Sequence, residues 1–111
     1  MPDWVKDFPA SITVIDADGT ILEMNEKARA TYATDGGADL IGKSIYHCHK
    51  PESEQRIREM IAAGANHVYT IEKNGRKILI YQQAWLRDGE PAGVVEIALE
   101  LPESIPHRVR S

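Results

Sequence analysis

Residues 15–25 read Ile15-Asp16-Ala17-Asp18-Gly19-Thr20-Ile21-Leu22-Glu23-Met24-Asn25, and the fold prediction begins from the two apolar runs in this segment. A β-branched run ends at Asp16, and a second apolar run begins after Gly19. Two such runs joined at a glycine predict a β-hairpin, because glycine readily adopts the backbone conformation of a tight turn. Asn25 then predicts the cap of a short helix over residues 26–33, since its side chain accepts hydrogen bonds from free backbone amides.

Further helices are predicted downstream of the hairpin. A breaker cluster at residues 35–39 makes the following segment, residues 40–49, short and partly irregular. Pro51 begins a longer helix, and Gly64 ends it at the position that a C-terminal glycine prefers. The apolar stripe of this helix consists of Ile57, Met60 and Ile61.

The last part of the chain changes to the period-two pattern of β-strands. Residues 68–71 lead into Asn74-Gly75, a strong hairpin signal, and a second strand spans residues 77–86. A glycine-containing turn connects it to a third strand over residues 93–100. These strands predict an antiparallel meander, and with the first hairpin they predict an α+β fold with helices on one face.

Taken in order, these elements resemble the PAS domain family over residues 9–100. The resemblance rests on residues 15–25, on Leu40-Ile41-Gly42-Lys43, and on residues 89–95 at the entry to the last strand. It implies a five-stranded antiparallel sheet with short helices on one face and a pocket between the two layers. A narrower likeness is the Cys-His-x-Pro-x-Ser run at residues 48–53, which resembles a segment of small PAS domains in anaerobic bacteria.

Composition places the chain among ordinary single-domain proteins. It has 111 residues, 42% of them hydrophobic, and a net charge of −4 with both signs interspersed. The sequence lacks the basic face that nucleic acid binding requires, and it lacks the ~18 consecutive apolar residues of a membrane span. The single cysteine excludes an internal disulfide and favours a reducing, cytoplasmic location.

The chain is predicted to have three parts. Residues 1–8 form an N-terminal helical cap or dimerisation segment, residues 9–100 the PAS domain, and residues 101–111 an extended tail. Pro102 and Pro106 oppose a continuing coiled coil. The tail therefore favours a free-standing module over one that runs into an output helix.

The tripeptide His47-Cys48-His49 is the first candidate for chemistry. In a helix, side chains two positions apart diverge by about 200°, so the two histidines do not share one metal ion and no metal site is predicted. Haem needs only one axial ligand and an apolar slot. Haem-binding PAS domains resembled here take that histidine from the long helix, but residues 52–63 contain none. A haem would be ligated by His47 or His49.

Cys48 is compared with the reactive cysteine of light-sensing PAS domains, which lies in an Asn-Cys-Arg-Phe motif directly after a Gly-Lys or Gly-Arg dipeptide. Here Ser44-Ile45 follows Gly42-Lys43, so a flavin is not expected. The interpretation of Cys48 is a small buried hydrophobe or a free thiol open to oxidation. Because neighbouring side chains rarely aim at each other, no catalytic residues and no enzyme activity are predicted.

The strand over residues 78–86 is apolar on both faces, which a sheet with one solvated face would not need. The strand is either central and well covered, or its outer face is covered by another protomer or by the N-terminal segment. Tyr81 and Gln83 on one face, with Tyr69 from the neighbouring strand, would offer polar groups to a small molecule. The predicted ligand-binding residues are Tyr46, His47, Cys48, His49, Tyr69, Tyr81 and Gln83.

The resemblance implies a stand-alone sensor or binding module for a small ligand, which signals by self-association or through a separate signalling protein. The alternative is a haem- or thiol-based redox or gas sensor that uses His47, His49 or Cys48. A homodimer is predicted, with Trp4-Val5 and Phe8 and the outer face of the last two strands at the interface. If the N-terminal segment instead folds back on its own sheet, the domain stays monomeric.

Overall fold

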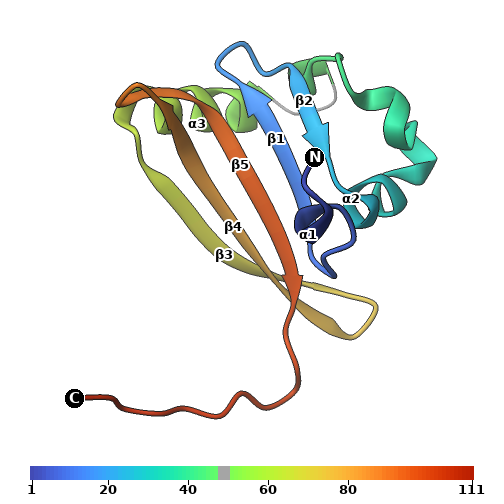
Figure 1. Ribbon diagram of the computed structural model, residues 1–111, viewed down its shortest axis with the longest axis vertical. Helices are drawn as coiled ribbons and strands as arrows, with labels where there is room; N and C mark the ends of the chain where they lie inside the picture. The colour runs from blue at the N-terminus through green and yellow to red at the C-terminus, as the bar shows by residue number, and fades with distance from the viewer. Residues whose placement is uncertain (48–50) are drawn as a thin grey trace.

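The structure, a computed structural model, describes residues 1–47 and 51–111, with His47 described in its backbone alone. Five strands form one antiparallel sheet in the order β2-β1-β5-β4-β3 (Figure 1). The elements are α1 (Asp3–Lys6), β1 (Ser11–Asp16), β2 (Ile21–Met24), α2 (Glu26–Thr31), three 3-10 turns (Ala33–Asp35, Gly37–Leu40 and Ile45–His47), α3 (Pro51–Ala63), β3 (Asn66–Lys73), β4 (Arg76–Arg87) and β5 (Glu90–Glu100). The predicted α+β class and five-stranded sheet are confirmed.

The core lies between the sheet and the helical layer. Figure 1 shows α3 behind the sheet, while α2 and the 3-10 turns lie beside β2. The predicted stripe of α3 is buried against residues from β1, β2, α2 and β5, because removing this apolar surface from water stabilises the fold. The buried core residues are Ile15, Ile21, Met24, Ala28, Ile57, Met60, Ile61 and Val94.

The first hairpin forms as predicted, and its turn has two stabilising features. The Asp16 carboxylate accepts hydrogen bonds from the backbone amides of Asp18 (2.9 Å) and Thr20 (3.0 Å). Gly19 has a φ of +80°, and a Cβ atom there would lie 2.5 Å from the ring of Tyr46. Glycine is therefore required both for the backbone conformation and for the approach of the Tyr46 ring.

Asn25 caps α2 as predicted and also holds two other segments in place. Its Oδ1 accepts from the amides of Ala28 and Ile12, each at 3.0 Å. Its Nδ2 donates to the carbonyl oxygens of Ala10 (2.8 Å) and Val5 (3.1 Å). One side chain, only 1% exposed, thus connects the N-terminal segment, β1 and α2.

The meander β3-β4-β5 begins with the predicted Asn74-Gly75 turn, in which both residues have positive φ. At its other end, Trp85 of β4 lies over Gly93 of β5 and donates its indole N–H to the carbonyl oxygen of Ile15 in β1 (2.9 Å). A Cβ atom on Gly93 would collide with that oxygen and with the indole nitrogen. Gly93 therefore lets one side chain connect three neighbouring strands.

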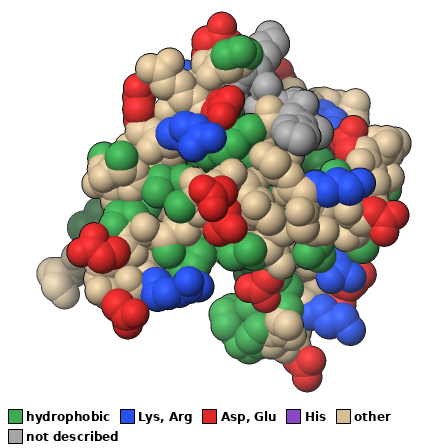
Figure 2. All heavy atoms as spheres, turned by 90° about the horizontal axis from the view of Figure 1, so that it is seen from above, with side chains coloured by type: hydrophobic (Ala, Val, Ile, Leu, Met, Phe, Trp, Pro, Cys, Tyr) green, Lys and Arg blue, Asp and Glu red, His purple; other side chains and the backbone are tan. Residues whose placement is uncertain are grey.

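The termini and the surface add four observations. No helix or strand follows Glu100 in the described tail, and no described helix is long and apolar enough to cross a membrane. Trp4 is 75% exposed, so its own sheet does not cover this side chain. Figure 2 shows acidic and basic side chains interspersed on the face seen from above.

Candidate functional site

A cavity of about 800 Å³ lies between the sheet and the helical layer. Its lining comes from all five strands, from α3 and from the segment between α2 and α3. Most of the inner wall is apolar, as in sites that bury small organic molecules. The apolar lining includes Ile15, Ile21, Met24, Ile57, Ile80 and Val94.

One row of polar side chains crosses this apolar wall, and we call it the polar row. It consists of Thr13, Glu96, Gln82 and His67, one residue from each of β1, β5, β4 and β3. The strand register sets Glu96 opposite both Thr13 and Gln82, and Gln82 opposite His67. Because directly opposed residues in an antiparallel sheet project to the same face, the four side chains share the cavity face.

Glu96 is the centre of the hydrogen bonds in the polar row. Gln82 Nε2 donates to Glu96 Oε2 at 2.7 Å. The hydroxyl of Tyr32, at the end of α2, donates to Glu96 Oε1 at 3.4 Å. Burial and then the Glu96 charge and hydrogen bond raise the pKa of Tyr32 to about 12. Tyr32 therefore keeps its proton near neutral pH and acts as a donor that connects α2 to β5.

The two ends of the polar row have unused hydrogen-bonding capacity. Thr13 Oγ1 and His67 Nδ1 are buried and have no hydrogen-bond partner among the described residues. The His67 ring lies 4.7 Å from the Tyr69 ring, centroid to centroid, which fixes one face of the imidazole. A buried polar atom without a partner costs about 1–3 kcal/mol, so a ligand that supplies the missing hydrogen bonds would bind more tightly.

The cavity has charges of both signs, but at different depths. Asp35, Lys43 and Arg56 line it with exposed side chains, whereas Glu96 is half-buried. Burial is the main cause of the raised pKa of Tyr69; Glu96 raises it further and Arg56 opposes the change. The exposed charges are screened by water, so the half-buried carboxylate of Glu96 is the least screened of these charges.

A comparison with known protein families gives a match over nearly the whole chain. The family model described as PAS fold matches residues 5–104. The chain belongs to the PAS fold family. No curated protein matches the sequence of this PAS domain.

Solved structures with a similar fold are distant in sequence from this PAS domain. A C-terminal domain from Streptococcus mutans superposes with a TM-score of 0.71 and 17% identity, covering 86% of this chain and 78% of that one. The Aer2 receptor from Vibrio cholerae, described as a dual PAS-heme oxygen sensor, gives 0.60 and 18%, covering 84% and 95%. The PAS domain of an HTR-like protein from Haloarcula marismortui gives 0.63 and 21%, covering 88% and 86%. These likenesses support the fold.

Of the residues predicted to bind a ligand, Tyr69 lines the cavity of this PAS domain. The expectation that Tyr81 and Gln83 share a face with Tyr69 is wrong. Tyr69 is paired with Ile80, and Tyr81 and Gln83 alternate with Ile80 and Gln82, which line the cavity. Successive strand residues point to opposite faces, so Tyr81 and Gln83 project from the outer face.

Tyr46 lies beside the cavity. It is half-buried and packs against the core, while the Arg58 guanidinium lies 4.4 Å from its ring centroid. Burial raises the pKa of Tyr46, and its hydroxyl has no hydrogen-bond partner among the described residues. Its neighbour Ser44 lines the cavity, but a ligand contact from Tyr46 itself stays a prediction.

The other predicted site residues cannot be placed in the same way. Cys48 and His49 lie outside the described residues, and so does the side chain of His47. Among the residues that are described, no group of three or more His, Cys, Asp or Glu side chains is arranged to hold a metal ion.

Sequence reasoning missed the polar row and Tyr32. A signal was present, because Gln82 and Glu96 each interrupt an apolar strand face, and Thr13 shares a strand face with Ile15. What was missing was the register, which alone shows that these interruptions are opposite one another.

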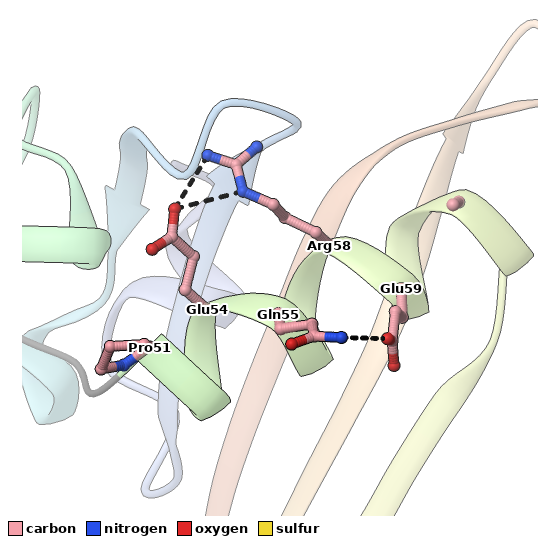
Figure 3. Close-up of a pocket in the computed structure, with 6 residues that line it drawn as sticks. Pro51, Glu54, Gln55, Arg58 and Glu59 are labelled. Atoms are coloured by element: carbon pink, nitrogen blue, oxygen red, sulfur yellow. Dashed lines mark hydrogen bonds and ion pairs between the residues drawn. The ribbon is translucent and has the colours of Figure 1, made fainter.

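A second, shallower hollow lies on α3 and does not make a comparable site. Figure 3 shows Glu54 pointing to Arg58 and Gln55 pointing to Glu59 along the exposed side of the helix. The Glu54–Arg58 ion pair measures 3.0 Å and the Gln55–Glu59 hydrogen bond 3.0 Å. These groups satisfy each other in the usual i,i+4 manner of a solvated helix. The cavity with the polar row is therefore the candidate site.

Proposed function

We propose that this PAS domain is a non-enzymatic sensor that binds a small molecule in the cavity and signals by self-association or through a separate partner. The polar row carries this proposal. A few convergent polar groups within an apolar cavity are the usual composition of a small-molecule site. The single cysteine supports a reducing, cytoplasmic location for this sensor.

A direct chain of contacts supports signalling from the cavity. Tyr32 follows the last residue of α2 and reaches Glu96, while Asn25 precedes the first residue and holds the carbonyl oxygen of Val5. A ligand that competes for Glu96 would change the Tyr32 contact at one end of this short helix. Because the helix is six residues long, movement at one end is expected to reach the N-terminal segment at the other.

The alternative from the sequence is a haem- or thiol-based sensor. The Aer2 receptor, which has a similar fold, is described as a dual PAS-heme oxygen sensor, and this similarity is the reason to test the alternative. Its ligating or reactive residues would be His47, His49 or Cys48, whose side chains are not described. We favour a directly bound small molecule because the polar atoms of the described cavity suit hydrogen bonding to a ligand.

The test is to locate binding in the purified, isotope-labelled chain. A library of small fragments is titrated while amide resonances are followed by NMR, and an absorption spectrum is recorded before any addition. We expect shifts concentrated on the polar row and no Soret band. Shifts concentrated on the α3 hollow, or none on the polar row, would contradict the proposal. A Soret band in protein purified without added cofactor would favour the haem sensor.

A further inference from the structure

Glu96 differs from the other charged side chains around the cavity. Among the charged residues that are described in the cavity lining, Glu96 alone is half-buried. It lies on the wall formed by β5. Lys43 and Arg56 are exposed, and no arginine or lysine is within ion-pair distance of Glu96 among the described residues. A carboxylate removed from water normally gains a cationic partner. Among the described residues, Glu96 has no such cationic partner.

The hydrogen bonds to Glu96 leave room for such a partner. A carboxylate offers about four lone-pair positions, and Gln82 and Tyr32 each donate to one oxygen. Next to Glu96 in the polar row, the Thr13 hydroxyl is buried without a partner and can accept a further hydrogen bond. Since neighbouring strands are about 4.8 Å apart, one donor group can approach both side chains.

We propose that the cavity binds a small organic amine, whose protonated nitrogen donates to Glu96 and Thr13 while its apolar body lies against Ile15, Ile80 and Val94. The inference rests on the proposed function and adds the chemical class of the ligand. An ammonium group carries three donors and a charge, so it satisfies the carboxylate and the hydroxyl together. A ligand carboxylate in the same position would be repelled by Glu96.

The position of His67 suggests how far such a ligand extends. His67 lies two strands away from Glu96 in the polar row, a separation of about 10 Å. The nitrogen at Glu96 cannot reach it directly. His67 Nδ1, buried without a partner, is therefore available to a second polar group at the far end of the ligand.

The experiment compares head groups on constant apolar bodies. Two series are titrated into the full chain and followed by NMR: phenethylamine, 2-phenylethanol and 3-phenylpropanoate, then hexylamine, hexanol and heptanoate. In the wild type we expect each amine to bind about ten-fold more tightly than the alcohol and the acid of its series. Glu96→Gln keeps the side-chain shape but removes the charge, so the preference for the amine should fall to about two-fold or less.

The control is Glu100→Gln, which changes an exposed carboxylate on the same strand and face, outside the cavity lining. It should keep the full preference for amines. Alcohols or acids that bind to the polar row as tightly as amines would overturn the inference and leave the proposed function intact. An unchanged preference in Glu96→Gln would also overturn it, provided that thermal unfolding shows a folded variant. Absence of any shift on the polar row, in either series, would count against both proposals.

Discussion

Asn25 is a buried polar residue that does more than cap a helix, because it also hydrogen-bonds to the N-terminal segment. Sequence reasoning identified it as a helix cap, because an asparagine before a helical run is a local signal. Its amide nitrogen also holds the carbonyl oxygens of Val5 and Ala10, which are remote in sequence. That second role depends on the folded chain and has no local signature.

Replacement of Asn25 by alanine is expected to lower the free energy of unfolding by about 2–4 kcal/mol, because the cap is lost and buried backbone groups lose their partners. Urea denaturation measures this change. Thr31→Ala is the control, since the Thr31 hydroxyl bonds to a backbone carbonyl at an exposed position. The control should lose about 0.5 kcal/mol or less. Equal losses in both variants would show that Asn25 connects nothing beyond α2.

Tyr32 predicts a specific dependence of stability on alkaline pH. Its pKa is raised from 10.0 to about 12 by burial and by Glu96, so the folded state holds the phenol proton more tightly than the unfolded state. The stabilising contribution is complete below pH 10 and is lost as pH rises towards 12. Urea denaturation across this range should therefore show a steeper fall in the wild type than in Tyr32→Phe. Parallel curves for the two proteins would argue against the Tyr32–Glu96 contact.

At the scale of elements, the sequence predicted those parts whose signals are local. The Gly19 hairpin, the Asn74-Gly75 turn and the α3 stripe each lie within a few neighbouring residues, and all are confirmed. The polar row could not be predicted in this way, because it depends on the relative register of four strands. A slip of one residue reverses the face of every side chain, and without the register the expectation that Tyr81 shares a face with Tyr69 was wrong.

The contact among β1, β5 and β4 predicts that Gly93 tolerates no side chain. Gly93→Ala is expected to lower the free energy of unfolding by about 3 kcal/mol, because a Cβ atom would collide with the Ile15 carbonyl oxygen and the Trp85 indole. Gly89→Ala is the matched control, with a positive φ but no atom within 4 Å of the added carbon. It should cost about 1 kcal/mol through backbone strain alone. Thermal or urea unfolding of both variants tests the difference, and equal costs would refute the proposed steric contact.

For the whole molecule, the exposed apolar residues are consistent with the predicted dimer, which can be tested directly. Phe8 is 47% exposed, and the exposed outer-face residues Val68, Tyr81 and Leu99 come from three strands. Asn25 holds the Val5 carbonyl close to β1, so the N-terminal segment has a defined place beside the sheet. A second copy that covers these side chains would remove apolar surface from water.

Sedimentation of the wild type should therefore show a dimer at micromolar concentrations, and Trp4→Ala/Phe8→Ala should weaken the association about ten-fold or more. Val109→Ala is the control. Like Trp4 and Phe8, Val109 is an exposed apolar residue (87% exposed), but it lies in the C-terminal tail. It should leave the association unchanged. A monomeric wild type, or a double variant that dimerises as tightly, would exclude this interface.

The polar row runs across the sheet and takes a single residue from each of four strands. Each of the four residues can therefore be substituted independently, because its neighbours in the row belong to other strands. Hydrogen-bonding preference at the cavity wall is thereby separable from the apolar packing that maintains the fold. A library limited to residues 13, 67, 82 and 96 would retune this domain as a biosensor, with the scaffold held constant.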